Sequence, residues 1–537
     1  MAIINNPTIT PSLQTSPIFR LKGMKSLFYP DAALTPEHCV NIKNVNFTEQ
    51  RTVDVKNGSS KFNTAQISGG PPVTGLFQVT YANGTVENIE VAGTAIHTND
   101  GSTRSVVTGT AVKTNVETAK IRAVYIDDKV VATDGTNRPW TKARGANCAL
   151  WADASGTGVT APFKNATGDS SEVEDFVKDF VVHRNYLCAL NTKENGTHHP
   201  TRIRWCDVDT PPDSGLDIFD WPIKHVYDLY ENGPPIVGGT DNFGRLLVFK
   251  EDGLYPCRLE FSQGLVELVI NPAEVRRGFS PVATHSILSR PEFTWVVCRD
   301  GAYIIRPDFS VEWVTQDFHN KWTQLDQSRI KHAVSFIRER DHQIRTLVST
   351  TDASNYFDQV MVWDWQTNDI WIDEPADEVS YATSYFISDK EYDYLGTGDG
   401  YAIKGNDPDV TTDNGENVEF DIHMAPNDLG HPGKTKRVVN LRSIVKTQTA
   451  SNSITVSAIR NQGQVLSRTG NISLGSGFYW GQAGIYWDDG VMTWPGGTTI
   501  AENLFINRTC ETIAPRWTGD GTVGLVGYQV ELVLEEN

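Results

Sequence analysis

The sequence feature that most constrains the fold is a hairpin that recurs along the chain. Three copies read RLLVFKEDGLYPCRL (245–259), FTWVVCRDGAYIIRPD (293–308) and DYLGTGDGYAIKGN (393–406). Each copy has an extended segment, an Asp-Gly pair, an aromatic residue one or two positions later, and a second extended segment. Asp-Gly is a strong hairpin signal because a type I′ turn needs positive φ at both central residues. The copies therefore predict antiparallel strand pairs.

The spacing of the turn glycines indicates a repeating unit. Gly253 and Gly301 are 48 residues apart, and Gly301 and Gly400 are 99 residues apart, which is close to two units. A copy with a longer loop is then expected near residue 350, where IRTLVSTT (344–351) and FDQVMVWDW (357–365) supply two extended segments. A spacing of roughly 40–50 residues with several strands per unit is typical of β-propellers.

The alternative is a set of unrelated hairpins in another kind of large β protein. Seven Asp-Gly pairs occur in the chain, against about three expected from composition, so their number alone is a modest hairpin signal. The regular spacing carries more weight than the number, and it favours the propeller.

Length and patterning predict three segments in an all-β chain. At 537 residues the protein exceeds one ordinary domain. We expect an N-terminal arm and platform segment over 1–65, a β-propeller of six or seven blades over 66–413, and a β-sandwich-like domain over 414–537. Past residue 413 the strands still alternate with period two but leave the 48-residue spacing.

The expected blades are strand meanders that follow one another along the middle segment. They lie near 75–110, 120–143, 178–206, 236–260, 282–313, 330–372 and 379–405. Residues 147–175 are rich in Gly, Ala, Ser and Thr and predict a long loop or a blade insertion. That loop could hide or break a blade, which is why the expected number is six or seven.

Charge and terminal sequence limit the classes of function. The net charge of −19 argues against a surface that binds nucleic acid through many Lys–phosphate contacts. It leaves open a channel whose acidic wall lets DNA pass without sticking. The first residues, MAIINNPTITPSLQTSP, lack the basic head and apolar core of a secretory signal, and no window reaches the apolar length of a membrane span. We therefore expect no membrane insertion.

The seven cysteines show no ligand pattern. They stand at positions 39, 148, 188, 206, 257, 298 and 510, without CxxC or Cys/His spacing. The simplest interpretation is reduced, buried thiols in a protein assembled in a cytoplasm.

Candidate chemical sites are few. His198 and His199 suggest a metal site, but nothing at ligand spacing accompanies them. A propeller channel could collect some of the histidines spread over the expected blades, although isolated surface histidines are the simpler interpretation; these are His183, His225, His285, His319 and His332. The chain has no GxSxG, no P-loop and no GxGxxG after a strand. A glycosidase needs a pair of carboxylates, which one sequence does not identify across blades. We therefore expect no enzyme activity, no catalytic, cofactor-binding or metal-binding residues, and no cofactor.

An aromatic stretch in the last segment leaves a binding function open. Residues 478–494, FYWGQAGIYWDDGVMTW, include Trp480 and Trp487, which could stack on sugars. A core or subunit contact is the alternative, because Trp and Tyr bury large areas and anchor interfaces. The first interpretation would make the protein a carbohydrate-binding or carbohydrate-active propeller that acts as a host-receptor binder.

Residues 19–62 carry a family resemblance. The segment is similar to the N-terminal part of the tail nozzle and tail accessory proteins of short-tailed bacteriophages. The matching pieces are Gly23-Met24, Phe28-Tyr29-Pro30-Asp31, Leu34-Thr35-Pro36-Glu37, 40–45 (VNIKNV) and Val55-Lys56-Asn57-Gly58. Further pieces that resemble blade segments of that family are 124–127 (VYID), 133–140 (TDGTNRPW) and 201–207 (TRIRWCD). The chain departs from the family at 50–53 (QRTV), where a Gly-led turn is common.

The resemblance implies a structural virion protein in the head–tail machine. Such proteins form a ring, here expected to be a homohexamer, below the tail adaptor and portal proteins. The ring retains packaged double-stranded DNA, forms its exit channel without sequence-specific contacts, and provides a docking place for a tail fibre or needle. The expected location is the phage tail, after assembly in the host bacterial cytoplasm.

Overall fold

The structure of the protein is a computed structural model that describes most of the chain. The described residues are 13–25, 34–48, 52–151, 174–207, 221–262, 265–353, 355–446, 452–461, 465–474, 499–520 and 523–534. Nearly all secondary structure in these ranges is β-strand, so the predicted all-β class is confirmed. The helices are single turns: α1 (His319–Trp322) and the 3₁₀ turns η2 (Thr284–Ser286), η3 (Val314–Phe318) and η4 (Ile330–His332).

The chain divides into two compact units instead of the three expected segments. The ring unit comprises Ser59–Val362 and Pro375–Asp407, and the sandwich unit comprises Met1–Gly58, Trp363–Glu374 and Pro408–Asn537. The N-terminal segment therefore groups with the last third of the chain. The reason is strand pairing over long sequence distances, which no local pattern reveals.

The ring unit is built from seven consecutive antiparallel sheets within the described residues. They are β7–β10 (Val73–Thr80, Val86–Ala92, Ala95–Asn99, Arg104–Val106), β11–β14 (Arg122–Ile126, Lys129–Thr133, Trp140–Ala143, Ala149–Leu150), β15–β18 (Glu174–His183, Tyr186–Glu194, Thr197–Trp205, Val226–Asp228), β19–β22 (Ile236–Asn242, Arg245–Lys250, Gly253–Ser262, Leu265–Ile270), β24–β27 (Leu288–Arg290, Phe293–Cys298, Gly301–Ile305, Val311–Trp313), β28–β30 (Val334–Arg338, Gln343–Val348, Gln359–Asp364) and β32–β34 (Val379–Ile387, Lys390–Thr397, Ala402–Asp407). The short strand β23 (Arg276–Arg277) adds to β21.

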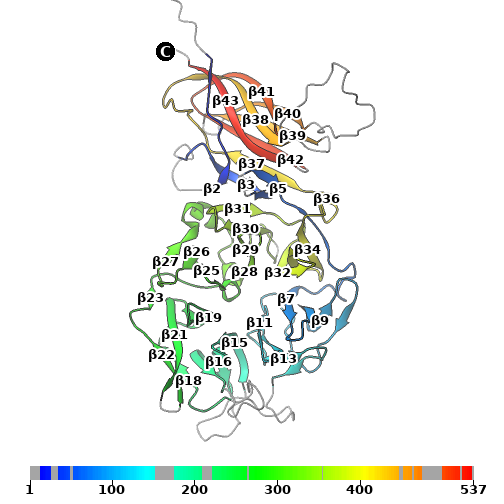
Figure 1. Cartoon of the computed structure of the whole chain (residues 1–537), viewed down its shortest axis with the longest axis vertical. Coiled ribbons are helices and arrows are strands. Elements are labelled where there is room, and N and C mark those ends of the chain that lie inside the picture. Colours follow the sequence, from blue (N-terminus) through cyan, green and yellow to red (C-terminus); the bar gives the residue numbers. More distant parts are fainter. Residues whose placement is uncertain are drawn as a thin grey trace, which may run out of the picture. The chain divides into compact units, whose positions relative to one another are not determined.

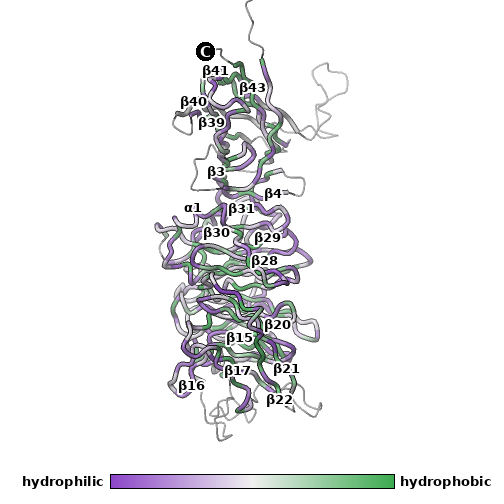
Figure 2. The backbone as a smooth tube through the Cα atoms, turned by 90° about the vertical axis from the view of Figure 1, so that its left-hand side faces the viewer, coloured by the Kyte–Doolittle hydropathy of each residue, from purple (hydrophilic) through white to green (hydrophobic). Residues whose placement is uncertain are grey.

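The first strands of these sheets form a closed circle. Strand β7 contacts β11, and the contacts continue through β15, β19, β24, β28 and β32 back to β7. Figure 1 shows the same sheets placed around a common centre, with their first strands toward it. Hydrophobic residues run along many of these strands, as Figure 2 shows, and they pack between neighbouring sheets. This arrangement is propeller-like, with one sheet for each of the seven meanders expected from the sequence.

The turns explain why the Asp-Gly signal works, and they correct its geometry. Gly253 and Gly301 open β21 and β26 after two-residue loops, and their φ values are 148° and 155°. Positive φ at both central positions occurs instead at Asp127-Asp128 and at Arg184-Asn185. The glycines in the repeat are needed for a different reason: a Cβ on Gly253 would lie 2.1 Å from the backbone oxygen of Arg276. The repeat signal was therefore correct in position but wrong in its assumed turn type.

An N-terminal strand completes the last sheet of the ring unit. Strand β6 (Gly58–Lys61) lies beside β34 in the sheet order, and the Phe62 backbone N–H donates to the Ala402 carbonyl at 2.8 Å. The ring of Phe62 packs against Tyr385 at 5.3 Å and Tyr394 at 5.1 Å between ring centroids. The circle is thus closed by residues from both ends of the unit.

Replacing Phe62 by alanine is expected to weaken this closure. A buried Phe→Ala change costs about 3–5 kcal/mol, and we expect about 2 kcal/mol here because Phe62 is half-buried. Urea unfolding monitored by tryptophan fluorescence measures the change. The matched control is Phe386→Ala, since Phe386 is 49% exposed. Equal effects of the two substitutions would contradict the role given to Phe62.

The sandwich unit contains two packed sheets, as expected for the C-terminal segment. One has the order β4-β5-β43-β38-β41 with β1 on β43, and the other runs β31-β3-β37-β42-β39-β40 with β2 on β3. The strands are β1 (Gln14–Thr15), β2 (Lys22–Met24), β3 (His38–Lys43), β4 (Val45–Phe47), β5 (Val53–Val55), β31 (Asp369–Asp373), β37 (Glu419–Met424), β38 (Lys436–Lys446), β39 (Asn452–Arg460), β40 (Val465–Leu474), β41 (Thr499–Cys510), β42 (Ile513–Asp520) and β43 (Gly524–Leu534), with a small hairpin β35–β36 (Thr412–Asp413, Glu416–Asn417). The sheets meet at the fully buried Trp517, whose indole N–H donates to Ser443 at 2.8 Å and whose ring lies 5.6 Å from that of Tyr528.

The cysteines agree with the buried thiols expected from the sequence. All seven thiols are free and buried. Burial raises the pKa of Cys148 to about 12 and that of Cys510 to about 11, so these thiols are not ionised at neutral pH. Within the ranges described above, no helix has the length and apolarity needed to cross a bilayer.

Candidate functional site

The best-defined group of polar side chains lies at the centre of the ring unit. We call it the axial cluster and define it by Glu117, Lys120, Arg122, Lys178, Asp179, His285, Arg329, Lys331, His332 and Tyr381. These residues sit at or just before the first strands of their sheets: in the loop before β11, on β11, on β15, in η2, at η4 and on β32. Because the first strands form the inner circle, residues from sheets that are not neighbours meet here.

Contacts across the centre establish this placement. The rings of His285 and Tyr381, from the fifth and seventh sheets, lie 6.1 Å apart. The Tyr381 hydroxyl donates to the Ile121 carbonyl at 3.0 Å, and Lys120 Nζ donates to the Ser380 carbonyl at 2.6 Å. These bonds join the seventh sheet to the second, although the first sheet stands between them around the circle.

Two ion-pair groups organise the cluster. Glu117 accepts hydrogen bonds from Lys120 at 2.7 Å and from Arg329 at 3.2 Å. Asp179, whose side chain is fully buried, accepts from Arg122 Nε at 2.9 Å and from the Gly239 backbone N–H at 2.9 Å. Both carboxylates therefore have partners and hold the surrounding cations in fixed positions.

Glycine at two positions of β19 makes room for the buried carboxylate. A Cβ on Gly238 would lie 2.8 Å from Asp179 Oδ2, and a Cβ on Gly239 would lie 2.7 Å from Leu190. Any larger residue would push β15 and β19 apart. The Gly-Gly pair thus allows Asp179 to reach between adjacent inner strands.

The two histidines of the cluster are neutral near pH 7. Burial, followed by the charges of Arg122, Lys120, Lys178 and His332, lowers the pKa of His285 well below its usual 6.5. Burial and the charge of Lys120 lower the pKa of His332 to about 4. The positive charge of the cluster therefore comes from Lys and Arg alone.

The structure brings together only two of the histidines noted in the sequence. His285 and His332 belong to the axial cluster, whereas the others have separate partners. His183 pairs with Asp241 at 2.7 Å, His198 with Asn191 at 2.6 Å and His319 with the Asp300 carbonyl at 3.3 Å, while His225 stacks on Trp205 at 5.3 Å. Among the residues described, no group of three or more His, Cys, Asp or Glu side chains could hold a metal ion.

Sequence reasoning missed the charged members of the cluster. Arg122 and Asp179 are 57 residues apart, and Lys120 and Ser380 are 260 apart, so no local motif joins them. The cluster residues lie at or just before the first strands of their sheets but at no shared offset, so the sequence carries no signal that joins them.

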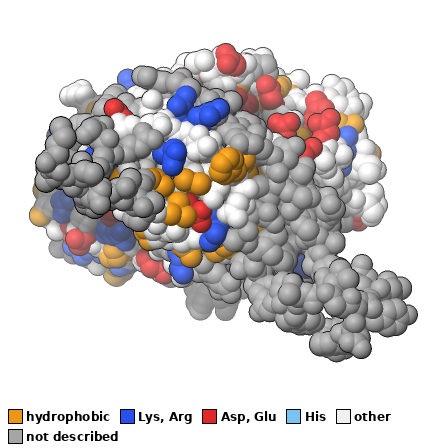
Figure 3. Space-filling model, turned by 90° about the horizontal axis from the view of Figure 1, so that it is seen from above, with side chains coloured by type: hydrophobic (Ala, Val, Ile, Leu, Met, Phe, Trp, Pro, Cys, Tyr) orange, Lys and Arg blue, Asp and Glu red, His pale blue; other side chains and the backbone are white. Residues whose placement is uncertain are grey.

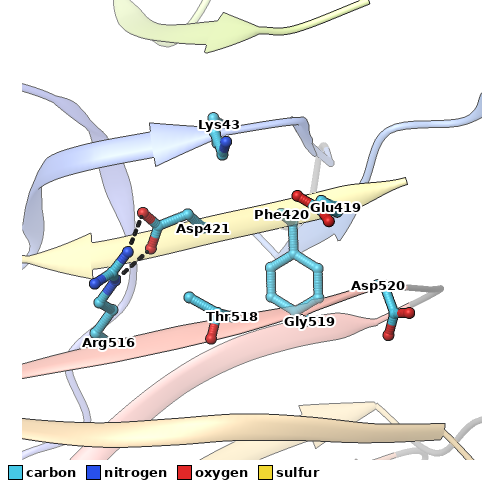
Figure 4. Close-up of a pocket in the computed structure, with 8 residues that line it drawn as sticks. All are labelled: Lys43, Glu419, Phe420, Asp421, Arg516, Thr518, Gly519 and Asp520. Carbon is cyan, nitrogen blue, oxygen red and sulfur yellow. Dashed lines mark hydrogen bonds and ion pairs between the residues drawn. The ribbon is translucent and has the colours of Figure 1, made fainter. Parts of the chain in front are cut away.

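A hollow in the sandwich unit differs in character from the axial cluster. Its volume is about 380 Å³, and it is lined by Lys43, Glu419, Phe420, Asp421, Arg516, Thr518, Gly519 and Asp520. Figure 4 shows Arg516 bound to both oxygens of Asp421, each at 2.8 Å. Asn41 also donates to Asp421 at 2.9 Å, and Lys43 pairs with Glu374 at 2.8 Å. These groups satisfy one another across β3, β37 and β42, which is typical of a structural network on a sheet surface.

The surface seen from above carries described side chains of several kinds. Acidic, basic and hydrophobic side chains are interspersed there, as Figure 3 shows. The aromatic stretch with Trp480 and Trp487, together with most of 147–175, lies outside the described residues.

Comparisons with known proteins identify no family for this chain. No protein-family model and no curated protein matches the chain. Among solved structures it is similar to the extracellular domain of a hybrid two-component system from B. thetaiotaomicron, with a TM-score of 0.35, 11% identity, and coverage of 65% of this chain and 39% of that chain. It is also similar to Raptor from Chaetomium thermophilum, with a TM-score of 0.39, 11% identity, and coverage of 66% and 30%. The chain thus spans less than half the length of either structure, and these values support no inference about function.

Proposed function

We propose that this protein is a structural subunit of the nozzle of a short phage tail. Six identical copies would form a ring that retains packaged DNA and later serves as its exit channel. Its partners would be the tail adaptor and portal proteins, a tail fibre or needle, and double-stranded DNA that passes without sequence-specific contacts. The protein would act in the virion as a scaffold and not as an enzyme.

The observation that carries the proposal is the resemblance of residues 19–62 to nozzle proteins. The described residues of this segment form strands in both units. In the sandwich unit, β3 pairs with β37 through partners such as Ile42 and Ile422, and β5 pairs with β43. In the ring unit, β6 lies beside β34. Because this segment pairs with distant strands in both units, its sequence has to fit the rest of the fold. The resemblance of the segment to nozzle proteins therefore supports a resemblance of the whole fold.

The charge of the chain is compatible with the proposed role. The net charge is −19, and an acidic wall repels phosphate and prevents DNA from adhering to the channel. Identical heterologous contacts between copies would close the ring.

The expected outcome of assembly measurements is a discrete ring. Mass photometry and negative-stain microscopy of the purified chain, alone and with the portal–adaptor complex of the phage that encodes it, should show particles of about six times 59.5 kDa. Mass spectrometry of purified virions should find the chain at a few copies per particle. A chain that stays monomeric in both mixtures and is missing from virions would exclude the nozzle role.

A further inference from the structure

We propose that the axial cluster binds a small phosphate-type oxyanion at the centre of the ring unit. The proposal rests on the geometry of the cluster and is independent of the nozzle function. It concerns an ion or small molecule, because its donors come from sheets on different sides of one centre and can surround only a compact ligand.

The cluster carries more positive than negative charge, although the chain as a whole is acidic. Its five cations are Lys120, Arg122, Lys178, Arg329 and Lys331, and the carboxylates that act on them are Glu117, Asp179, Glu251 and Asp326. With neutral histidines, the balance is positive. An anion at this place would be attracted by the local charge despite the net charge of −19.

Two lysines of the cluster form no ion pair with a described residue. Glu117 is occupied by Lys120 and Arg329, and Asp179 by Arg122 and Gly239. Lys178 and Lys331 are exposed to solvent, and neither forms a hydrogen bond or ion pair with another described residue. Their charges nonetheless act on each other. Two like charges that repel each other favour a shared anionic partner.

Unpartnered polar atoms also lie in the cluster. His285 Nδ1 and Arg329 Nε are buried and have no hydrogen-bond partner among the described residues. A buried polar atom without a partner costs free energy, so a ligand that bonds to it is favoured. Arg329 can only donate, and neutral His285 can present an N–H on either nitrogen. With the two lysines, these groups form a set of donors that suits a tetrahedral oxyanion with several acceptor oxygens.

Solvent can reach this position. Lys178 and Lys331 are exposed, and His332 and Arg122 are only half-buried. A small ligand could therefore enter and leave without unfolding the ring unit.

Isothermal titration calorimetry with inorganic phosphate tests the proposal on the full-length protein. Sulfate serves as a second oxyanion, and sodium chloride at matched ionic strength controls for screening. We expect saturable binding of phosphate and sulfate, and a rise in the melting temperature that chloride does not reproduce. No saturable phosphate signal, or equal stabilisation by chloride, would overturn the site.

Substitution of the two unpaired lysines locates the binding. Lys178→Met and Lys331→Met each remove one charged donor, so each should weaken phosphate binding about tenfold. Neither lysine has a described partner, so both variants should fold. Lys224→Met is the matched control, because Lys224 is exposed and lies outside the cluster. Unchanged affinity in both cluster variants, or equal loss in the control, would refute the placement.

Discussion

Replacing Glu90 by alanine is expected to lower the free energy of unfolding of the ring unit by about 3–5 kcal/mol, the usual cost of removing one partner from a buried ion pair. The side chain of Glu90 is fully buried on β8. It accepts hydrogen bonds from Asn99 at 2.5 Å, from Tyr394 at 2.6 Å and from Arg104 at 2.7 Å. The substitution would leave a nearly buried guanidinium without its counter-charge.

The position of Glu90 makes the effect reach beyond one sheet. Glu90 belongs to the first sheet and Tyr394 to the last, so their bond helps to close the circle. Burial raises the pKa of Tyr394 well above its usual value, and the hydroxyl therefore remains a donor across the accessible pH range. Loss of the carboxylate removes both an ion pair and a closing contact.

Urea unfolding followed by tryptophan fluorescence measures the Glu90→Ala effect. Glu312→Ala is the control, because its pair with Arg306 is about half exposed and such pairs contribute about 0–1 kcal/mol. A loss of less than 1 kcal/mol in Glu90→Ala, with an unchanged dependence on denaturant, would show that the network contributes little to stability.

The second large effect is expected for Asp179→Ala, at about 3 kcal/mol. This carboxylate is fully buried, but its partner Arg122 retains 22% side-chain exposure, so water can compensate part of the loss. The backbone N–H of Gly239 also loses its acceptor. Unfolding in urea and the melting temperature should both register the change.

A double-mutant cycle separates the interaction energy of the Arg122–Asp179 ion pair from the other effects of the two substitutions. The double variant Arg122→Met/Asp179→Ala should lose clearly less free energy of unfolding than the sum of the losses in the two single variants. The reason is that each single substitution leaves one charge without its partner. Strict additivity would mean that Arg122 and Asp179 do not interact as the 2.9 Å contact implies.

The repeat pattern could be predicted because it is local. Hairpin turns such as Asp127-Asp128 and Arg184-Asn185 lie between apolar runs, and all four residues adopt positive φ. The spacing of the hairpins then followed from the uniform size of the sheets. The turn at Asp252-Gly253 was placed correctly, but its geometry was not, because the close approach of Arg276 arises only in the folded sheet.

The remaining features depend on contacts between distant residues. Nothing in residues 38–43 indicates that β3 pairs with a strand some 380 residues later, so the sequence predicts an N-terminal arm and platform segment. Of the axial cluster, the sequence analysis names only His285 and His332. Its charged members come from different repeats, and a single sequence does not show which inner positions face one another.

The use of β6 to complete the last sheet has a consequence for synthesis on the ribosome. This strand leaves the exit tunnel long before its partner β34, which begins at Ala402. At translation speeds of about 5–20 residues per second, β6 waits for roughly 20–70 seconds before that partner exists. During this interval its edge and the neighbouring Phe62 ring are open to other chains, so crowded polysomes and fast expression would favour domain-swapped products, in which one nascent chain lends its β6 to another.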